Sequence, residues 1–199
     1  MRLPDLVSRH PVSLGLATAW SISALSLSQL PGSTVERVLH LGSTTLPRLA
    51  AWPVALPVSG LLVRDDLALW LLTLAFGTAV VEAHVGWRSA LLLISTVHVG
   101  ATALSQALLG IRVALGEASE QLLHQLDVGP SYLAIAGLAG AAILARSNRL
   151  RLLPLAALAV GLPELIDGLP AYDLAATGHL AAAVLGLTGG LLLRRRTAR

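Results

Sequence analysis

Residues 174–193 read LAATGHLAAAVLGLTGGLLL, a stretch that contains no Asp, Glu, Lys or Arg. A helix of about 20 mostly apolar residues crosses the hydrocarbon core of a bilayer. Inside hydrocarbon each backbone N–H and C=O needs a partner within the protein, which an α-helix provides. The stretch shows no alternation of apolar and polar residues, which a half-buried strand would show. It therefore predicts a transmembrane helix.

Five further stretches share this apolar character: residues 11–30, 67–84, 89–111, 129–146 and 150–166. Six spans of this length occupy well over half of the 199 residues and leave little chain for a soluble domain. We therefore expect an all-α membrane protein, a bundle of six transmembrane helices in which residues 1–199 form one transmembrane domain. The first span follows Arg2 and Arg9 as a signal peptide would, but it lacks a clear small-x-small cleavage site.

The composition supports a membrane protein and excludes several other classes. Only 13% of the residues are charged and 55% are hydrophobic, against about 25% charged residues in soluble domains. The chain has no Cys, which excludes disulfides, thiol nucleophiles and thiolate metal sites. Aromatic residues make up 4%, so we expect no nucleic-acid partner. All 14 basic residues are Arg in a chain rich in Ala, Leu and Gly, which is typical of a GC-rich bacterial genome.

The distribution of arginines predicts the orientation. With the N-terminus inside, the inner side holds most of them, namely Arg2, Arg9, Arg88, Arg146, Arg149, Arg151, Arg194, Arg195, Arg196 and Arg199. The outer side holds Arg37, Arg48, Arg64 and Arg112. Because basic residues concentrate in cytoplasmic loops, we expect both termini in the cytoplasm and the protein in the bacterial plasma membrane.

Two connections on the predicted outer side are longer than the others. Residues 31–66 contain two short apolar pieces, 49–54 and 56–63, broken by prolines. Neither piece is long enough to span, so we expect both to lie at the membrane interface. Residues 112–128 predict a short amphipathic helix.

The sequence GPSY, Gly129 to Tyr132, begins the fourth predicted span. Pro130 suits the first turn of a helix, and Gly129 allows another backbone to approach closely. Ser131 then lies one turn inside the membrane. The ordinary interpretation is a helix start that Asp127 caps, with Ser131 bonded to its own backbone.

Histidines within spans are the other candidates, because polar groups in hydrocarbon are costly and are often functional. His179 is followed by small residues that let two helices pack closely. The third span carries a polar stripe on one helix face: Ser95, His98, Thr102 and Ser105. Hydrogen bonding between helices explains both features. A proton path through His98, with Glu164, would instead indicate a small transporter, but paired broken helices are missing.

Depth relates Ser131 to His179. The fourth and sixth spans run in the same direction, and at 1.5 Å per residue both side chains lie within about 5–8 Å of the outer boundary. A neutral imidazole can take the proton of a serine hydroxyl and so activate it as a nucleophile. Helix N-terminal N–H groups beside Ser131 could bind the resulting oxyanion. This pair needs no cofactor and no metal.

This constellation resembles the rhomboid intramembrane serine proteases, and more closely their actinobacterial rhomboid-like branch. Rhomboids carry G-x-S-G at the start of the fourth helix and a His in the sixth, which Gly129, Ser131 and His179 match. The stretch EAHVGWRSALLL, Glu82 to Leu93, is similar to the family's turn between helices two and three. The resemblance implies structural roles for Glu82, Gly86 and Arg88. It also implies cleavage of transmembrane substrates near the outer membrane face.

The sequence departs from the family pattern in two places. Rhomboids usually carry His-x-x-x-Asn in the second helix to assist the oxyanion, whereas RDDLALWLL, residues 64–72, has neither residue. Tyr132 replaces the Gly that follows the nucleophile in rhomboids. The later glycines of this helix also fit the rhomboid spacing better when they are counted from Tyr132 than from Ser131. We therefore keep two functions open: a protease with Ser131 and His179 as its catalytic pair, assisted by Gly129, His98 and Thr102, or an inactive relative that binds other membrane proteins.

Overall fold

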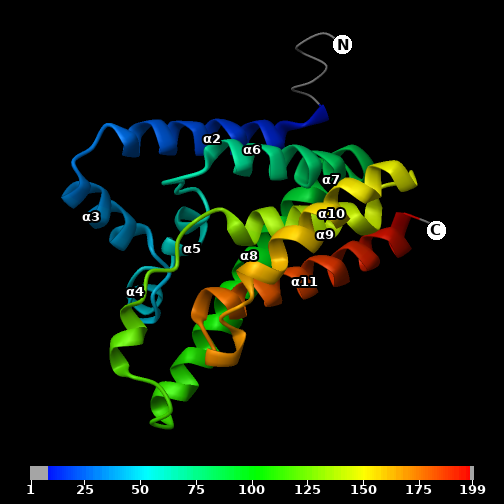
Figure 1. Ribbon diagram of the computed structural model, residues 1–199. Helices are drawn as coiled ribbons and strands as arrows, with labels where there is room; N and C mark the ends of the chain where they lie inside the picture. Colours follow the sequence, from blue (N-terminus) through cyan, green and yellow to red (C-terminus); the bar gives the residue numbers. More distant parts are fainter. Residues whose placement is uncertain (1–8, 198–199) are drawn as a thin grey trace.

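The computed structural model describes residues 9–197, and this range contains helices and turns but no strand (Figure 1). Arg2 and Arg199, which entered the orientation argument, lie outside it. Helical segments occupy all six predicted positions: α2 (Pro11–Ser28), α6 and α7 (Leu67–Phe76 and Thr78–Val85), α8 (Trp87–Ala114), α9 (Ser131–Leu144), α10 (Asn148–Leu165) and α11 (Leu174–Thr197). The second position is split because Gly77 adopts φ −102° and ψ −91°, outside the helical region.

Four helical stretches are long and apolar enough to cross a membrane: Pro11–Ser28, Leu67–Val85, Trp87–Ala114 and Leu174–Thr197. The other two differ for identifiable reasons. α9 has 14 residues, about 21 Å of helix, which is shorter than a hydrocarbon core of about 30 Å. α10 has 18 residues but contains Arg149, Arg151 and Glu164. The all-helical membrane architecture is therefore confirmed, whereas the count of six spans remains a prediction.

The two long connections differ from their predicted structures: the first forms three short helices, and the second contains less helix than predicted. Residues 31–66 form three short helices, α3 (Gly32–Gly42), α4 (Leu46–Ala51) and α5 (Ala55–Ser59). The prediction of an amphipathic helix over 112–128 is wrong. α8 ends at Ala114, Gly116 follows with φ +75°, and only Glu120–His124 forms a 3₁₀ turn, η1. A second 3₁₀ turn, η2 (Leu169–Ala171), precedes α11.

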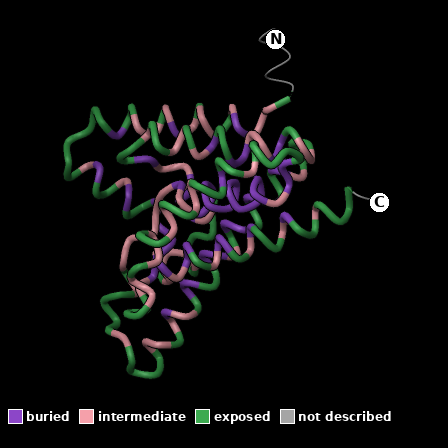
Figure 2. The backbone as a smooth tube through the Cα atoms, turned by 45° about the vertical axis from the view of Figure 1, so that its right-hand side comes forward, coloured by how far each residue is buried: buried purple, intermediate pink, exposed green. Residues whose placement is uncertain are grey.

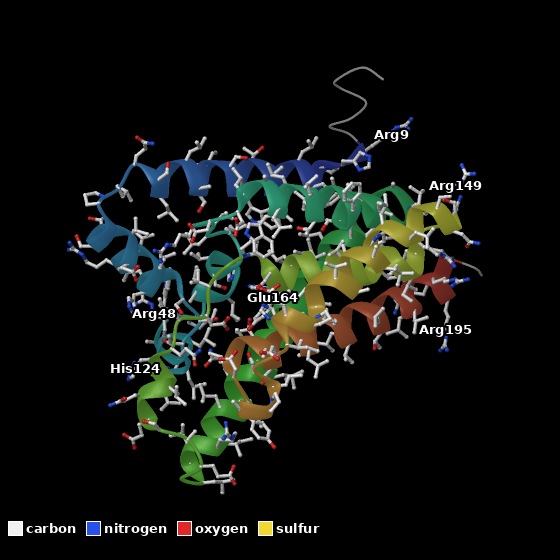
Figure 3. All side chains as sticks on the ribbon, in the orientation of Figure 1. Arg9, Arg48, His124, Arg149, Glu164 and Arg195 are labelled. Atoms are coloured by element: carbon white, nitrogen blue, oxygen red, sulfur yellow. The ribbon has the colours of Figure 1, made fainter. Side chains whose placement is uncertain are left out.

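The bundle has two different ends. One end, here called the arginine end, holds the turn at Gly86, residues 145–147 and the last turn of α11. The opposite end, here called the loop end, holds residues 29–66, 115–130 and 166–173. Figure 1 shows that α2 begins and α11 finishes at the arginine end. In Figure 3 Arg9, Arg149 and Arg195 gather at this end, whereas Arg48 and His124 lie at the other.

α9 forms the centre of the bundle. It packs against α6, α7, α8, α10 and α11, and all of its residues except Ser131 and Ile143 are buried. A helix that is apolar on every side is stable in this position because neighbouring helices cover each face. Figure 2 shows the buried positions concentrated in the middle of the molecule. The helix that carries Ser131 is thus held from all sides.

The outer helices present large apolar side chains away from the core. Exposed examples are Ile22 and Leu25 on α2, Leu152 and Val160 on α10, and Leu192 on α11. Soluble monomers rarely expose apolar patches of this kind over several helices. Together with the four spanning stretches, these surfaces indicate a lipid bilayer as the environment of the protein.

Candidate active site

Ser131 and His179 come from two helices that begin at the loop end. Ser131 is the first residue of α9, directly after Pro130. Asp173 fixes the start of α11, because its carboxylate accepts the Ala176 N–H at 2.9 Å. His179 follows one and a half turns into α11. The Ser131 Oγ and the His179 Nε2 lie 3.0 Å apart, within hydrogen-bonding distance.

The other imidazole nitrogen determines the tautomer of His179. The Nδ1 lies 2.9 Å from the carbonyl oxygen of Leu165, the last residue of α10. A carbonyl oxygen can only accept, so Nδ1 carries the proton and donates it. In a neutral imidazole Nε2 then has a free lone pair, which accepts the Ser131 hydroxyl. His179 is buried, so the ring is held in this orientation.

The structure does not support the prediction that Asp127 caps the start of α9. Asp127 does not cap α9, because its carboxylate accepts the Thr44 hydroxyl at 2.8 Å. The Thr44 N–H also donates to the Asp127 carbonyl at 3.0 Å, so the α3–α4 connection is hydrogen-bonded to the segment that precedes α9. Burial raises the pKa of the Asp127 carboxyl above its ordinary value, although the Thr44 bond opposes the shift.

Gly129 positions the chain just before Ser131. Its φ of +135° lies in a region that residues with a side chain rarely adopt. In this conformation the Gly129 N–H donates to the Ser59 carbonyl at 2.9 Å, so the end of α5 is joined to the entrance of α9. Gly129 therefore has a backbone role beside the Ser131–His179 pair.

Tyr132 packs against His179 rather than replacing Ser131. Its ring lies edge-on to the imidazole, with 5.4 Å between ring centroids and 77° between planes. Within residues 9–197 the buried tyrosine hydroxyl has no hydrogen-bond partner. A Cβ placed on Gly178 would overlap that hydroxyl, so the glycine is required for the close approach of the ring to α11. Ser131, not Tyr132, is the residue whose hydroxyl meets the imidazole.

His98 and Thr102 form no hydrogen bond with Ser131 or His179 in the described part of the chain. The His98 Nε2 lies 2.8 Å from the Leu56 carbonyl oxygen and 3.2 Å from the Ser59 Oγ. Its ring lies 6.0 Å from that of Tyr132, which separates it from His179. Thr102 is fully buried, and its hydroxyl has no partner. These side chains form a second polar layer behind Tyr132.

Backbone N–H groups beside Ser131 remain available. The first hydrogen bond that closes a turn of α9 runs from the Ala134 N–H to the Pro130 carbonyl at 2.9 Å. The N–H groups of Ser131, Tyr132 and Leu133 precede it and have no intrahelical acceptor. A helix N-terminus of this kind attracts negative charge.

One contributor to the site, the Leu165 carbonyl, and one buried polar residue on α8, Gln106, were not predicted. The Leu165 carbonyl leaves no signal in the sequence, because any residue at the end of α10 provides one. Gln106 lies four residues after Thr102 and is also buried with both amide atoms unpaired, so helical spacing could have identified it. Ser95, by contrast, belongs to the predicted stripe but is exposed. Residues 9–197 contain no cluster of His, Asp or Glu able to hold a metal ion.

Comparison with known proteins agrees with this geometry at the level of the family. Residues 11–199 match the family described as rhomboid-like protein. No curated protein and no solved structure matches the chain. The family match covers the six helical positions, including both residues of the hydrogen-bonded pair. The chain therefore belongs to the family of rhomboid-like membrane proteins.

Proposed function

We propose that the protein is an intramembrane serine endopeptidase in which Ser131 is the nucleophile and His179 the general base. The observation that supports this function most strongly is the 3.0 Å contact between the Ser131 Oγ and the His179 Nε2. The contact matters because the bond to Leu165 leaves Nε2 as the acceptor. A serine needs such a base, since its hydroxyl is a weak nucleophile at neutral pH.

The geometry supports a two-stage reaction. The Ser131 oxygen attacks the scissile carbonyl carbon while its proton moves to the His179 Nε2, and the charge that develops on the carbonyl oxygen faces the free N–H groups at the start of α9. The C–N bond then breaks as Nε2 returns the proton to the leaving amine. Water, deprotonated by the same nitrogen, attacks the acyl carbon, and the bond to the Ser131 oxygen breaks as Nε2 returns the proton to that oxygen. The Leu165 carbonyl stabilises the imidazolium in both stages.

The position of the pair suggests where a substrate is cut. Ser131 begins α9 and His179 lies in the second turn of α11, both near the loop end. Under the orientation predicted from the arginines, this is the outer side of the membrane. A transmembrane substrate would therefore be cleaved near its outer boundary, where its helix must unwind to expose a peptide bond.

Cleavage in reconstituted vesicles tests this function. Transmembrane peptides with helix-destabilising residues near one boundary would be incubated with the protein, and fragments would be identified by mass spectrometry. We expect cleavage by the wild type and its loss in Ser131→Ala and His179→Ala. Ser95→Ala is the matched control, because Ser95 is exposed on α8 away from the pair. Fragments of the same sequence from the Ser131→Ala variant would overturn the proposal.

A second candidate function is the binding of membrane helices without cleavage. It is favoured by Tyr132, whose bulky ring packs against the His179 imidazole, and by α6, whose sequence contains no His or Asn. Losing one oxyanion donor lowers rates by about 10²–10³ in other serine proteases. This function predicts partners that co-purify under mild extraction and remain bound in Ser131→Ala. Partners released by that substitution would speak against it.

A further inference from the structure

A polar cavity lies at the arginine end, away from Ser131 and His179. It has a volume of about 300 Å³, and three of the side chains that line it are Arg146, Arg151 and Arg194. Arg146 precedes α10, Arg151 lies in the first turn of that helix and Arg194 lies near the end of α11. Residues distant in the sequence thus converge on one space. Figure 3 shows the neighbouring Arg149 and Arg195 at this same end of the molecule.

No carboxylate neutralises these three arginines within residues 9–197. The ion pairs of this range lie at the loop end and join Arg64 to Glu36 and Asp65, and Arg112 to Glu117. The acid nearest to the cavity in sequence is Glu82, and both of its carboxylate oxygens already accept hydrogen bonds from the start of α2. Among residues 9–197 the cavity therefore carries a positive charge that no ion pair balances.

His84 shapes the cavity without adding charge. Its Nε2 accepts the Arg146 backbone N–H at 3.2 Å, and its Nδ1 donates to the Val80 carbonyl at 2.7 Å. An imidazole with one accepting nitrogen is neutral. The Arg151 Nε donates to the Ala145 carbonyl, which fixes that guanidinium against the same turn. Arg146 and Arg151 are thus anchored through the backbone, and their terminal N–H groups remain available.

The chemistry of the cavity matches an anion with several oxygens. A guanidinium presents parallel N–H donors whose spacing fits the oxygens of a phosphate group. Three like charges that converge on one cavity repel one another, and an anion between them removes this repulsion. α10 begins beside the cavity at Asn148, and the positive end of its dipole adds to the attraction.

We propose that this cavity binds a phosphate group. The group can belong to the headgroup of an anionic phospholipid in the adjacent leaflet or to free inorganic phosphate, because both offer the same oxygens. Val85 and Leu144 also line the cavity and provide an apolar wall beside the arginines. The site is independent of the proposed proteolysis, since it shares no residue with the Ser131–His179 pair.

Two matched double variants test the site in the full-length protein. Arg146→Gln/Arg194→Gln removes two lining charges. Arg149→Gln/Arg195→Gln removes two charges from the same turn and the same helix end, but neither residue lines the cavity. Each protein, purified in dodecyl maltoside, is titrated with dioctanoyl phosphatidic acid at constant ionic strength. Thermal unfolding is followed by tryptophan fluorescence, and dioctanoylglycerol serves as the phosphate-free control lipid.

We expect saturable stabilisation of the wild type and of the Arg149→Gln/Arg195→Gln variant. In Arg146→Gln/Arg194→Gln the dissociation constant should rise at least about tenfold, because charge-assisted hydrogen bonds from two guanidinium groups to the phosphate are lost. Equal weakening in both variants would show diffuse attraction to the basic end and overturn the site. Absence of saturable binding to the wild type, or an equal response to dioctanoylglycerol, would overturn it as well.

A second titration with inorganic phosphate identifies the source of the group. Binding of inorganic phosphate with the same dependence on the variants supports the site and assigns it to a soluble anion. Binding of phosphatidic acid alone supports the site and assigns it to a lipid headgroup. If Arg146→Gln/Arg194→Gln does not fold, Arg194→Gln is compared with Arg195→Gln, because both residues are exposed near the end of α11.

Discussion

At the scale of single residues, the Ser131–His179 pair depends on contacts that surround it more than on the two side chains alone. The Leu165 carbonyl selects the tautomer, Gly129 turns the chain, and Gly178 gives the Tyr132 ring its place against the imidazole. The depth argument from the sequence predicted that Ser131 and His179 meet, and the structure places them at hydrogen-bonding distance. Their catalytic role remains a prediction.

Gly178→Ala should disturb this arrangement. The new methyl group would overlap the Tyr132 hydroxyl and the adjoining ring carbon, so the ring must move. Overpacking of this kind costs about 1–3 kcal/mol of unfolding free energy. Thermal unfolding of the variant measures the loss.

Gly161→Ala is the matched control for this substitution. Gly161 also lies inside a helix, but a Cβ there would meet nothing within 4 Å. Alanine favours helix by about 1 kcal/mol over glycine, so this variant should be as stable as the wild type or more so. Equal destabilisation of both variants would contradict the packing of Tyr132 against α11.

Asp127→Asn should change how stability depends on pH. Burial raises the pKa of this carboxyl, so the folded protein binds the proton more tightly than the unfolded chain does. The stabilisation is complete below the ordinary carboxyl pKa and is lost as the pH rises through the raised value. The amide can still accept the Thr44 hydroxyl, and His98 and Tyr132 are present in both proteins, so the comparison isolates the Asp127 carboxyl.

Unfolding midpoints of the wild type and of Asp127→Asn, measured from about pH 4 to pH 8, check this expectation. The wild type should lose stability relative to the variant as the pH rises. A constant difference between the two proteins across the range would show that Asp127 does not titrate with folding.

At the scale of helices, α2 is joined to the bundle through one buried carboxylate. Glu82 on α7 accepts the Val12 N–H at 2.8 Å and the Ser13 N–H at 2.9 Å, and it also accepts the Ser13 hydroxyl. The N-terminus of α2 has no side-chain cap of its own. Glu82 therefore caps a helix that is distant in sequence and fixes its position against α7.

Glu82→Gln should weaken the attachment of α2 to α7 and so lower the free energy of unfolding. The amide keeps one accepting oxygen and turns its NH₂ toward backbone N–H donors, so at least one charge-assisted bond is lost. The expected loss of unfolding free energy is about 1.5–3 kcal/mol. Chemical or thermal unfolding in detergent measures it.

Glu164→Gln provides the comparison, because Glu164 is exposed near the end of α10 and accepts no side-chain hydrogen bond within residues 9–197. A surface change of this kind should stay within about 0.5 kcal/mol. If both variants lose the same stability, Glu82 does not act as the cap of α2.

The helices also show which features the sequence could predict. Long apolar runs predict spans because the burial of apolar side chains and the hydrogen bonding of the backbone in lipid both depend on many residues. Short connections are decided by single residues instead. Gly77 breaks the second helix and Gly116 follows the end of α8, whereas the sequence over 112–128 predicted a short amphipathic helix. The equal depth of Ser131 and His179 could be predicted from the sequence. The contact of His179 with Leu165 could not, because a backbone carbonyl does not depend on the side chain.

At the scale of the whole molecule, the two ends of the bundle differ in charge. The arginine end holds the basic turns beside α10 and the last turn of α11, whereas the loop end holds the ion pairs. Basic residues concentrate on the cytoplasmic side of membrane proteins. We therefore predict that the arginine end faces the cytoplasm and that the Ser131–His179 pair lies toward the opposite face.

The absence of Cys makes this orientation directly measurable. Gln121→Cys places a thiol at the loop end and Asn148→Cys places one at the arginine end, and both positions are exposed. A membrane-impermeant maleimide added to intact cells should label Gln121→Cys, while Asn148→Cys should react only after permeabilisation. The reverse pattern would invert the predicted topology.

The central claim is that Ser131 is activated by His179, and a fluorophosphonate probe tests it most directly. Purified wild type would be labelled beside Ser131→Ala, His179→Ala and the control Ser95→Ala, with the modified residue identified by mass spectrometry. We predict labelling of Ser131 in the wild type and in Ser95→Ala. It should disappear in Ser131→Ala and slow by at least about 10³-fold in His179→Ala. A folded wild type that takes up no label, or labelling that His179→Ala leaves unchanged, would contradict the account.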